Sequence, residues 1–187
     1  MVCQYRKQMI IQSKWSVEKV QLQTQSDVSC LNHTYSLWIH KHEKKTWEQD
    51  TYDKICTIST PREFWMLLNN ISEICAMKHH IYLMQGDIMP MWEHADNING
   101  SRYSIRIVQE NKKIETLTDM AVRMVSGELT NCNNVNGISY NHNADGSIFV
   151  KIWGNSKSRV FSQSICSEIQ KRYKLGAKCM DNNKLNR

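Results

Sequence analysis

The pattern of apolar and polar positions along the chain predicts several short strands. In each run apolar residues recur at about every second position, which is the period of a strand with one buried face. In the first run, for example, Leu37 and Ile39 share a face. The predicted strands are residues 35–41, 54–58, 81–85 and 103–108, and a hairpin of residues 138–142 and 148–153 around Ala144, Asp145 and Gly146.

Three other stretches have apolar residues at helical spacing. The first begins at Pro61, because proline suits the first turn and Thr60 can cap it. The second ends at Gly127 and the third near Gly176. The apolar stripes are Phe64, Leu67, Leu68 and Ile71; Leu117, Ala121, Met124 and Val125; and Val160, Ile165, Ile169 and Tyr173. Because hairpin-like strand pairs are interspersed irregularly with helices, the pattern favours an α+β fold with an antiparallel sheet over a doubly wound parallel sheet.

The 187 residues suggest one domain with a substantial core. Residues 1–28 are polar without a steady period and are predicted to be a flexible N-terminal arm. Residues 29–180 form the predicted domain, and residues 181–187 a polar tail. The sequence has no apolar run of about 18 residues and no apolar signal core at its start. We therefore expect a cytoplasmic protein with no membrane contact.

Composition adds two hints of a nucleic-acid partner. The net charge of +6 is compatible with RNA, although an ordinary soluble protein with spare lysines fits it as well. Six tryptophans offer flat rings that stack on bases, although most tryptophans in proteins lie in cores.

The cysteines and histidines give no sign of a metal site. The seven cysteines are scattered, odd in number and without a C-x-x-C pair, which favours reduced thiols over a zinc site or a disulfide framework. His79 and His80 are expected on the surface, because adjacent side chains rarely point the same way and no cysteine or carboxylate cluster joins them.

Local catalytic motifs are missing: the chain contains no phosphate-binding loop, nucleophile elbow or H-E-x-x-H pair. The informative segment is residues 89–93, which ends in Trp92 and Glu93. An indole offers a stacking face, and a carboxylate can accept two hydrogen bonds from the donor edge of guanine. The dipeptide alone is a weak signal, and a half-buried tryptophan is the alternative.

Several motifs together resemble the eukaryotic translation initiation factor 4E family. Residues 86–93, followed by Asn97, Gly100, Arg102 and Tyr103, resemble its G-I-x-P-M-W-E…N…G-G-x-W signature. Residues 36–38 and 45–47 resemble A-L-W and K-T-W, residues 63–65 resemble D/E-F-W, and residues 127–128 and 151–153 fall where the family has G-E and I-A-I-W. The order and spacing hold from about residue 31 to 175.

The resemblance implies a non-catalytic protein that needs no cofactor and binds the 7-methylguanosine cap of messenger RNA. Its fold would be a curved antiparallel sheet of about eight strands with about three helices on the convex face. Trp47 and Trp92 would sandwich the base, whose positive charge attracts both rings. Glu93 would accept from the guanine edge, and the backbone N–H of Trp92 would reach O6. Trp153 would pack by the N7 methyl, with core packing at a strand end as its alternative.

The resemblance also shows where phosphate recognition differs. Arg102 matches a basic position near the cap phosphates. The family has further basic residues on the hairpin, where this chain has Asn143, Ala144 and Asp145. Base recognition is therefore expected to be retained and phosphate recognition altered. Candidate substitutes nearby in the sequence are Lys151, Lys157 and Arg159.

A second implied site lies on the convex face, where the family binds the scaffold factor 4G or 4E-binding proteins. Trp65 would be its anchor, with Pro61 and Leu68 beside it. The second helix carries Asp119 and Arg123 where the family surface is apolar, which points to an altered partner motif or weak binding. The chain is thus expected to recruit capped mRNA to the ribosome through a scaffold. The alternatives are a cap-binding repressor and an interaction module that has lost cap affinity.

Overall fold

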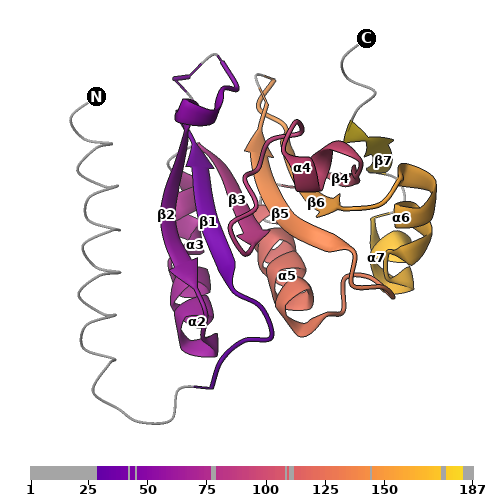
Figure 1. The fold of residues 1–187 in the computed structure, drawn as a ribbon, viewed down its shortest axis with the longest axis horizontal. Coiled ribbons are helices and arrows are strands. Elements are labelled where there is room, and N and C mark those ends of the chain that lie inside the picture. The colour runs from indigo at the N-terminus through magenta and orange to yellow at the C-terminus, as the bar shows by residue number, and fades with distance from the viewer. Residues whose placement is uncertain are drawn as a thin grey trace.

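Seven antiparallel strands form one sheet in the order β2-β1-β3-β5-β6-β4-β7 (Figure 1). The computed structural model describes residues 29–41, 43–44, 46–76, 79–107, 109, 112–143, 145–173 and 176–182, so the predicted arm 1–28 lies outside them. The strands are β1 (Tyr35–His40), β2 (Tyr52–Ile58), β3 (His80–Gln85), β4 (Ser101–Ile107), β5 (Val135–His142), β6 (Ile148–Gly154) and β7 (Ala177–Asp181). The predicted α+β fold is confirmed, with seven strands in the described residues where the resemblance implied about eight.

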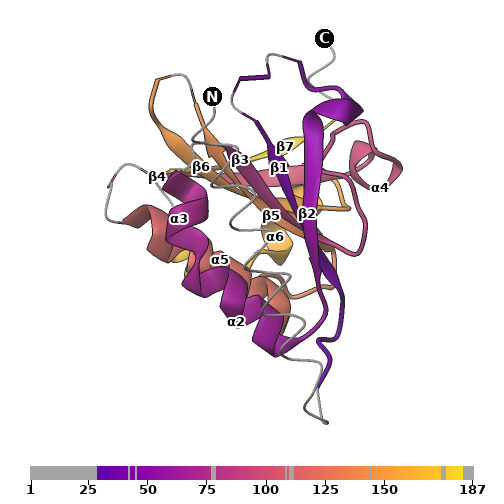
Figure 2. The same cartoon turned by 90° about the vertical axis from the view of Figure 1, so that its left-hand side faces the viewer.

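Helices cover one face of this sheet, and Figure 2 shows α2, α3 and α5 side by side there. The helices are α2 (Pro61–Asn69), α3 (Ile71–Ala76), α4 (Ala95–Ile98), α5 (Lys113–Ser126), α6 (Ser158–Ser164) and α7 (Ser167–Arg172), with a 3₁₀ turn, η1 (Gln49–Thr51), before β2. The predicted start of the first helix is confirmed. The Thr60 hydroxyl accepts from the Glu63 N–H at 3.2 Å, and the Glu63 carboxylate accepts from the Thr60 N–H at 3.2 Å. Gly127 ends α5 at φ 79°, as predicted.

Two predicted helices are each broken into a pair. The first is interrupted at Asn70, whose side-chain amide donates to the Met66 carbonyl at 2.9 Å and separates α2 from α3. The third is interrupted at Ile165 and Cys166, where ψ values of 133° and 134° are not helical. Apolar spacing continues across both breaks, so the sequence pattern could not reveal them.

The strand β7 and the helix α4 were not predicted. Strand β7 pairs with β4 along its whole length, and it takes Asp181 into the sheet. Asp181 and Asn182 are both buried. Residues 181 and 182, which were expected in the polar tail, therefore belong to the folded domain.

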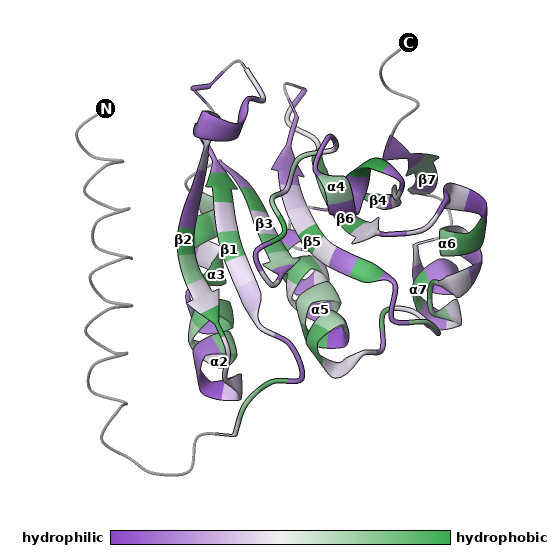
Figure 3. Ribbon diagram, viewed as in Figure 1, coloured by the Kyte–Doolittle hydropathy of each residue, from purple (hydrophilic) through white to green (hydrophobic). Residues whose placement is uncertain are grey.

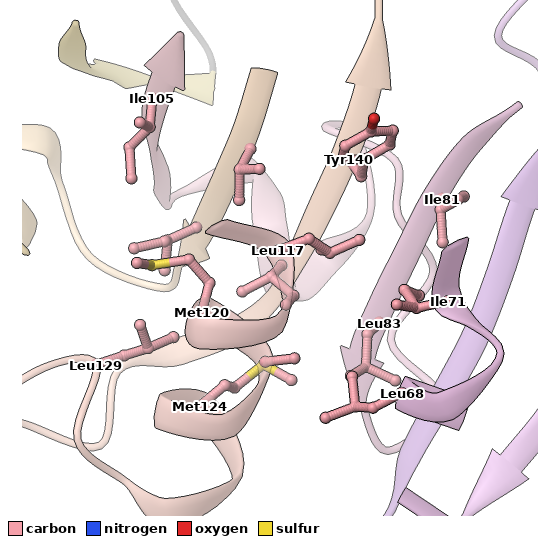
Figure 4. Packing of buried hydrophobic residues seen from close by; sticks show 14 of the residues in the cluster. Leu68, Ile71, Ile81, Leu83, Ile105, Leu117, Met120, Met124, Leu129 and Tyr140 are labelled. Atoms are coloured by element: carbon pink, nitrogen blue, oxygen red, sulfur yellow. The ribbon is translucent and has the colours of Figure 1, made fainter. Parts of the chain in front are cut away.

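The main core lies between the sheet and the helices. Alternate strand residues such as Leu37, Leu83 and Ile152 point into it. Figure 4 shows Leu68 and Ile71 turned toward β3 from the neighbouring helices. Leu68 is only 8% exposed, which corrects its expected place on the partner surface. It belongs to the apolar stripe that holds α2 on the sheet.

The concave face, opposite these helices, carries a second apolar cluster. It consists of Trp38, Tyr52, Tyr82, Met84 and Trp153. The segment between β3 and α4 packs on this cluster through Ile88, Met89, Met91 and Trp92. Figure 3 shows that the β1–β2 connection, in contrast, is largely hydrophilic. Among the helices of the described residues, none is long and apolar enough to cross a membrane.

Candidate functional site

A buried asparagine fixes the backbone that precedes Trp92. Asn97 is fully buried, and its side-chain amide donates to the carbonyl oxygens of Met89 and Met91, both at 2.8 Å. One amide group thus ties together two residues of an otherwise irregular loop. This contact explains why an asparagine stands at this point of the signature, and it holds Trp92 on the concave face.

Two further buried asparagines hold Asn97 in turn. The Asn136 amide, from β5, donates to the Asn97 side-chain oxygen at 2.9 Å. The Asn182 amide donates to the Asn97 carbonyl at 2.7 Å. All three side chains are at most 4% exposed, so these hydrogen bonds are shielded from water. We call Asn97, Asn136 and Asn182 the asparagine trio.

Arg102 covers one face of Trp92. Its guanidinium carbon lies 4.5 Å from the centre of the Trp92 ring, which is a cation–π contact. The guanidinium also donates to the Asn182 side-chain oxygen at 3.3 Å. Arg102 is 5% exposed, and this burial lowers the pKa of its guanidinium. The structure therefore brings the predicted residues Trp92 and Arg102 into direct contact.

Trp47 lies between β1 and η1 and is 52% exposed. Its indole stacks on the imidazole of His40, with ring centres 4.2 Å apart and planes inclined by 15°. The His40 Nε2 lies 2.8 Å from the Thr46 carbonyl oxygen, so this nitrogen carries the hydrogen and donates. His40 is fully buried and thus forms a rigid support behind one face of Trp47.

The predicted surface position of His79 and His80 is wrong, because both are buried. His80 is the first residue of β3 and is paired directly with His40 of β1, so the two side chains share the concave face. The His80 ring lies 5.0 Å from the Trp47 ring. His80 therefore belongs to the surroundings of Trp47.

Glu93 is exposed, and its charge reaches Tyr52 of β2. Burial raises the pKa of the Tyr52 hydroxyl to about 12; a hydrogen bond with Tyr82 opposes this rise, and the negative charge of Glu93 adds to it. Tyr52 also meets His40 edge-on, with ring centres 5.0 Å apart. The charge of Glu93 and the ring of His40 thus both act on Tyr52.

Trp153 forms part of the floor of the concave face. It is 2% exposed, and its indole N–H donates to the Ser139 hydroxyl at 3.0 Å. Its ring meets Tyr82 edge-on, with centres 6.2 Å apart. This placement fits the alternative of core packing at a strand end, because little of the ring is left for a ligand to touch.

Lys151 points to the same face two residues before Trp153. It lies opposite Ser139 of β5 and Ser104 of β4. Burial, and then the nearby positive charge of Arg102, lower the pKa of Lys151 to about 8. Lys151 is one of the three candidate substitutes for the hairpin residues. Of these three, it is the one that interacts electrostatically with Arg102.

In the predicted hairpin between β5 and β6, the acidic residue Asp145 is hydrogen-bonded to a nearby residue of the same turn. The Asp145 carboxylate accepts from the Ser147 N–H at 2.9 Å and from its hydroxyl at 2.6 Å, and these bonds lower the pKa of Asp145. The same carboxylate lies 3.8 Å from the Arg106 guanidinium. The positive charge of Arg106 on β4 therefore partly balances the negative charge of Asp145.

The sequence pattern of the family "Eukaryotic initiation factor 4E" matches residues 30–186. This chain belongs to the eukaryotic initiation factor 4E family. The Saccharomyces cerevisiae initiation factor 4E is 24% identical over 136 residues, which are 69% of this chain and 63% of the relative. The Caenorhabditis elegans factor 4E-1 is 35% identical over 89 residues, 46% of this chain and 41% of the relative.

Solved structures of initiation factor 4E proteins share the fold. Caenorhabditis elegans eIF4E-3 in complex with the 4E-binding protein Mextli has a TM-score of 0.74 at 16% identity, over 86% of this chain and 97% of that one. A schistosome eIF4E complexed with m7GpppA and 4E-BP has a TM-score of 0.70 at 21% identity, over 86% and 92%. Against curated relatives the chain spans less, 51% of the Dictyostelium discoideum factor and 63% of the Candida glabrata factor.

The convex face of this 4E-family chain exposes the side chain of Trp65. Trp65 of α2 is 52% exposed and meets Phe64 edge-on, with ring centres 5.7 Å apart. Pro61, one turn before it, is partly buried. The exposed position of Trp65 agrees with its place off the predicted apolar stripe.

The charged residues of α5 are bound to α7. Arg123 lies 3.1 Å from Asp119 and 3.0 Å from Glu168, while Arg172 lies 3.5 Å from Asp119. This ion-pair network lies on the part of the second predicted helix where Asp119 and Arg123 were expected to replace the family's apolar surface. It leaves Trp65 as the main exposed apolar feature of α2.

Sequence reasoning missed His40 and two members of the asparagine trio. His40 follows Trp38 by two residues, so strand alternation alone could have placed it on the concave face. Asn136 and Asn182 had no such signal, because their contacts join residues about 40 and 85 positions apart in sequence. No group of three or more metal-ligating side chains occurs within the described ranges.

Proposed function

We propose that this protein binds the 7-methylguanosine cap of messenger RNA on the concave face, with the methylated base between Trp47 and Trp92. The observation that carries the proposal is that both tryptophans are held from behind. Trp47 rests on His40, and Trp92 rests on Arg102 and a loop fixed by Asn97. Ascaris suum eIF4E-3, with a TM-score of 0.67 to this chain, has been solved with the m7G cap.

The chemistry of the base fits these groups. Methylation at N7 gives the guanine a delocalised positive charge, which is attracted to the negative faces of both indoles. The Glu93 carboxylate accepts from N1–H and from the exocyclic amine, two donors that only guanine presents side by side. The base takes the face of Trp92 that Arg102 leaves, and the backbone N–H of Trp92 reaches O6.

In the cell, the protein acts in the cytoplasm as an initiation factor that brings capped messages to the ribosome through scaffold factor 4G, and it catalyses no reaction. Trp65 with Pro61 on α2 receives the partner helix. A cap-binding repressor is the second candidate, because the ion pairs between α5 and α7 reduce the apolar surface beside α2. If the protein retains a 4G-derived peptide, the first role is supported. If it binds the cap but does not retain the peptide, the second role is supported.

Titration of the full chain with 7-methyl-GTP and with GTP, followed by tryptophan fluorescence, tests cap binding. The expected result is quenching by the methylated nucleotide at a much lower concentration than by GTP. Trp65→Ala is a matched control for Trp47→Ala, because both tryptophans are 52% exposed but lie on opposite faces. Equal affinities for the two nucleotides, or equal losses in the two variants, would refute the proposal.

A further inference from the structure

An apolar strip on α2 is open to solvent. Pro61 and Trp65 lie one turn apart on this helix and therefore share a face, and Met66 lies beside them. Trp65 is 52% exposed, while Pro61 and Met66 are partly buried. We call Pro61, Trp65 and Met66 the α2 strip. An indole that stays half in water leaves a large apolar area that a partner surface can still bury.

Two exposed carboxylates lie on the same helical side of the sheet, where α2, α3 and α5 run side by side (Figure 2). They belong to Glu73 of α3 and to Glu128, which follows α5, and within the described residues no hydrogen bond or ion pair engages either group. The acidic residues of α5 differ, because they are paired with Arg123 and Arg172. The exposed cation of α2 itself is Arg62. This side therefore offers an apolar strip together with unpaired carboxylates.

The chain that precedes the described domain contains a segment of matching character. Residues 5–15, which we call the arm segment, read Y-R-K-Q-M-I-I-Q-S-K-W. The arm segment has five large apolar or aromatic side chains, three basic side chains and no acidic one. The rest of the arm, residues 16–28, has one basic residue, Lys19, and two acidic residues, Glu18 and Asp27. Apolar bulk and positive charge are thus combined in the arm segment.

The arm joins the described domain at the start of α2. The Leu31 N–H donates to the Ser59 carbonyl at 2.8 Å, and the next residue, Thr60, caps α2. Trp65 lies four residues after Pro61, about 6 Å along the helix axis. Residues 16–28 can span up to about 45 Å when extended. The arm segment can therefore reach the α2 strip of the same molecule.

We propose that the arm segment docks on the α2 strip of its own chain, with its apolar side chains against Trp65 and its basic side chains toward Glu73 and Glu128. A short tether holds such a segment at an effective concentration on the order of millimolar, so a weak contact is enough. The docked arm occupies the surface that the proposed function gives to a partner helix, and a partner must displace it. This competition rests on the proposed function, whereas the docking itself does not.

Fluorine NMR of the full chain labelled with 5-fluorotryptophan tests the docking, and Trp65→Phe assigns the Trp65 signal. The arm variant is Ile10→Asp with Ile11→Asp. Its matched control is Val20→Asp with Leu22→Asp, which places the same charges in the arm but outside the arm segment. We expect the arm variant to shift the Trp65 signal and to increase its response to replacing H2O by D2O, which measures solvent exposure. The control should keep the signal of the parent.

Three results of this experiment overturn the inference. The first is a Trp65 signal that is the same in the parent and in the arm variant. The second is an equal shift in the control. The third is a parent signal that changes on dilution, because the strip is then covered by the arm of a second copy. The readout needs neither a nucleotide nor a partner, so its outcome is independent of cap binding.

The competition is measured by titrating the same full-length variants with the 4G-derived peptide. The arm variant should bind the peptide about tenfold more tightly than the parent, as when a millimolar effective concentration opposes a contact of about 0.1 mM affinity. Equal affinities overturn the competition. If none of the proteins binds the peptide, the partner role in the proposed function fails, and the fluorine signal still decides the docking. A thermal melt of each variant confirms that it folds.

Discussion

The two halves of the concave face differ in how their side chains are satisfied. On β1, β2 and β3 the aromatic and imidazole rings support one another: Trp47 stacks on His40, and Tyr52 meets both His40 and Tyr82. On β4 and β6, Lys151 and its cationic neighbour have no acidic partner among the described residues. The first half is packed ring against ring, and the other half has unbalanced charge. A ligand with a flat cationic head and an anionic tail is complementary to both halves.

The largest loss is expected from removing the ring that joins the two halves. Trp92→Ala removes one side of the proposed base sandwich and also the surface on which Arg102 rests. We expect 7-methyl-GTP affinity to fall at least as far as in Trp47→Ala, by roughly 1–3 kcal/mol or about ten- to a hundredfold. Fluorescence or calorimetric titration measures this. Parent-like affinity in both variants would show that the base does not stack there.

Glu93→Gln tests the hydrogen bonds of the aromatic half without changing its shape. Glutamine has one acceptor oxygen and one donor amide, so one guanine N–H would face another donor. Leaving such a donor unsatisfied costs about 1–3 kcal/mol. The preference for 7-methyl-GTP over 7-methyl-ITP, which lacks the exocyclic amine, should also shrink. If affinity and preference both stay as in the parent, Glu93 is not at the guanine edge.

Two variants separate the contribution of the His40 ring from that of its hydrogen bond. His40→Ala removes the stack behind Trp47, and we expect cap affinity to fall by about 0.5–1.5 kcal/mol, the usual range for an aromatic pair. His40→Phe keeps a ring and loses only the hydrogen bond to Thr46, so it should lose less. Titration of both variants with 7-methyl-GTP decides this. Equal losses would mean that the hydrogen bond, rather than the stack, positions Trp47.

The smallest expected effect is the change in stability caused by Lys151→Met. The pKa of Lys151 falls from 10.5 to about 8 on folding, so between these pH values the unfolded chain binds more protons and the free energy of unfolding rises with pH. Below pH 8 the charge destabilises the folded chain in full. Because part of the side chain is screened by solvent, we expect Lys151→Met to be more stable at pH 7 by roughly 1 kcal/mol, or about 2–4 °C.

Denaturant titrations of the parent and Lys151→Met at pH 7 and pH 10 measure this difference. The advantage of the variant should shrink at the higher pH, because the parent has by then lost the unfavourable charge. A constant advantage would mean that Met gains by packing alone. A less stable variant at pH 7 would show that Lys151 has a favourable partner.

The sequence predicted the strands β1 to β6, because apolar residues of the core recur along each of them. It predicted the Trp92 loop from its motif, but not the contacts that hold it. Asn136 is polar, lies at a strand start and bonds across 39 positions to Asn97, so no local pattern reveals it. Strand β7 escaped prediction for a related reason. Its sequence mixes charged and apolar residues, and its pairing with β4 is what makes it a strand.

The asparagine trio has a consequence for the time at which this protein matures during synthesis. A chain made from its N-terminus has Trp47 and Trp92 available long before Asn182 emerges. Yet Asn182 closes the trio and also accepts the hydrogen bond from Arg102. We therefore expect a nascent chain that stops short of residue 182 to carry both tryptophans on an unfinished loop. Full ligand competence would then arrive only once β7 and Asn182 have left the ribosome.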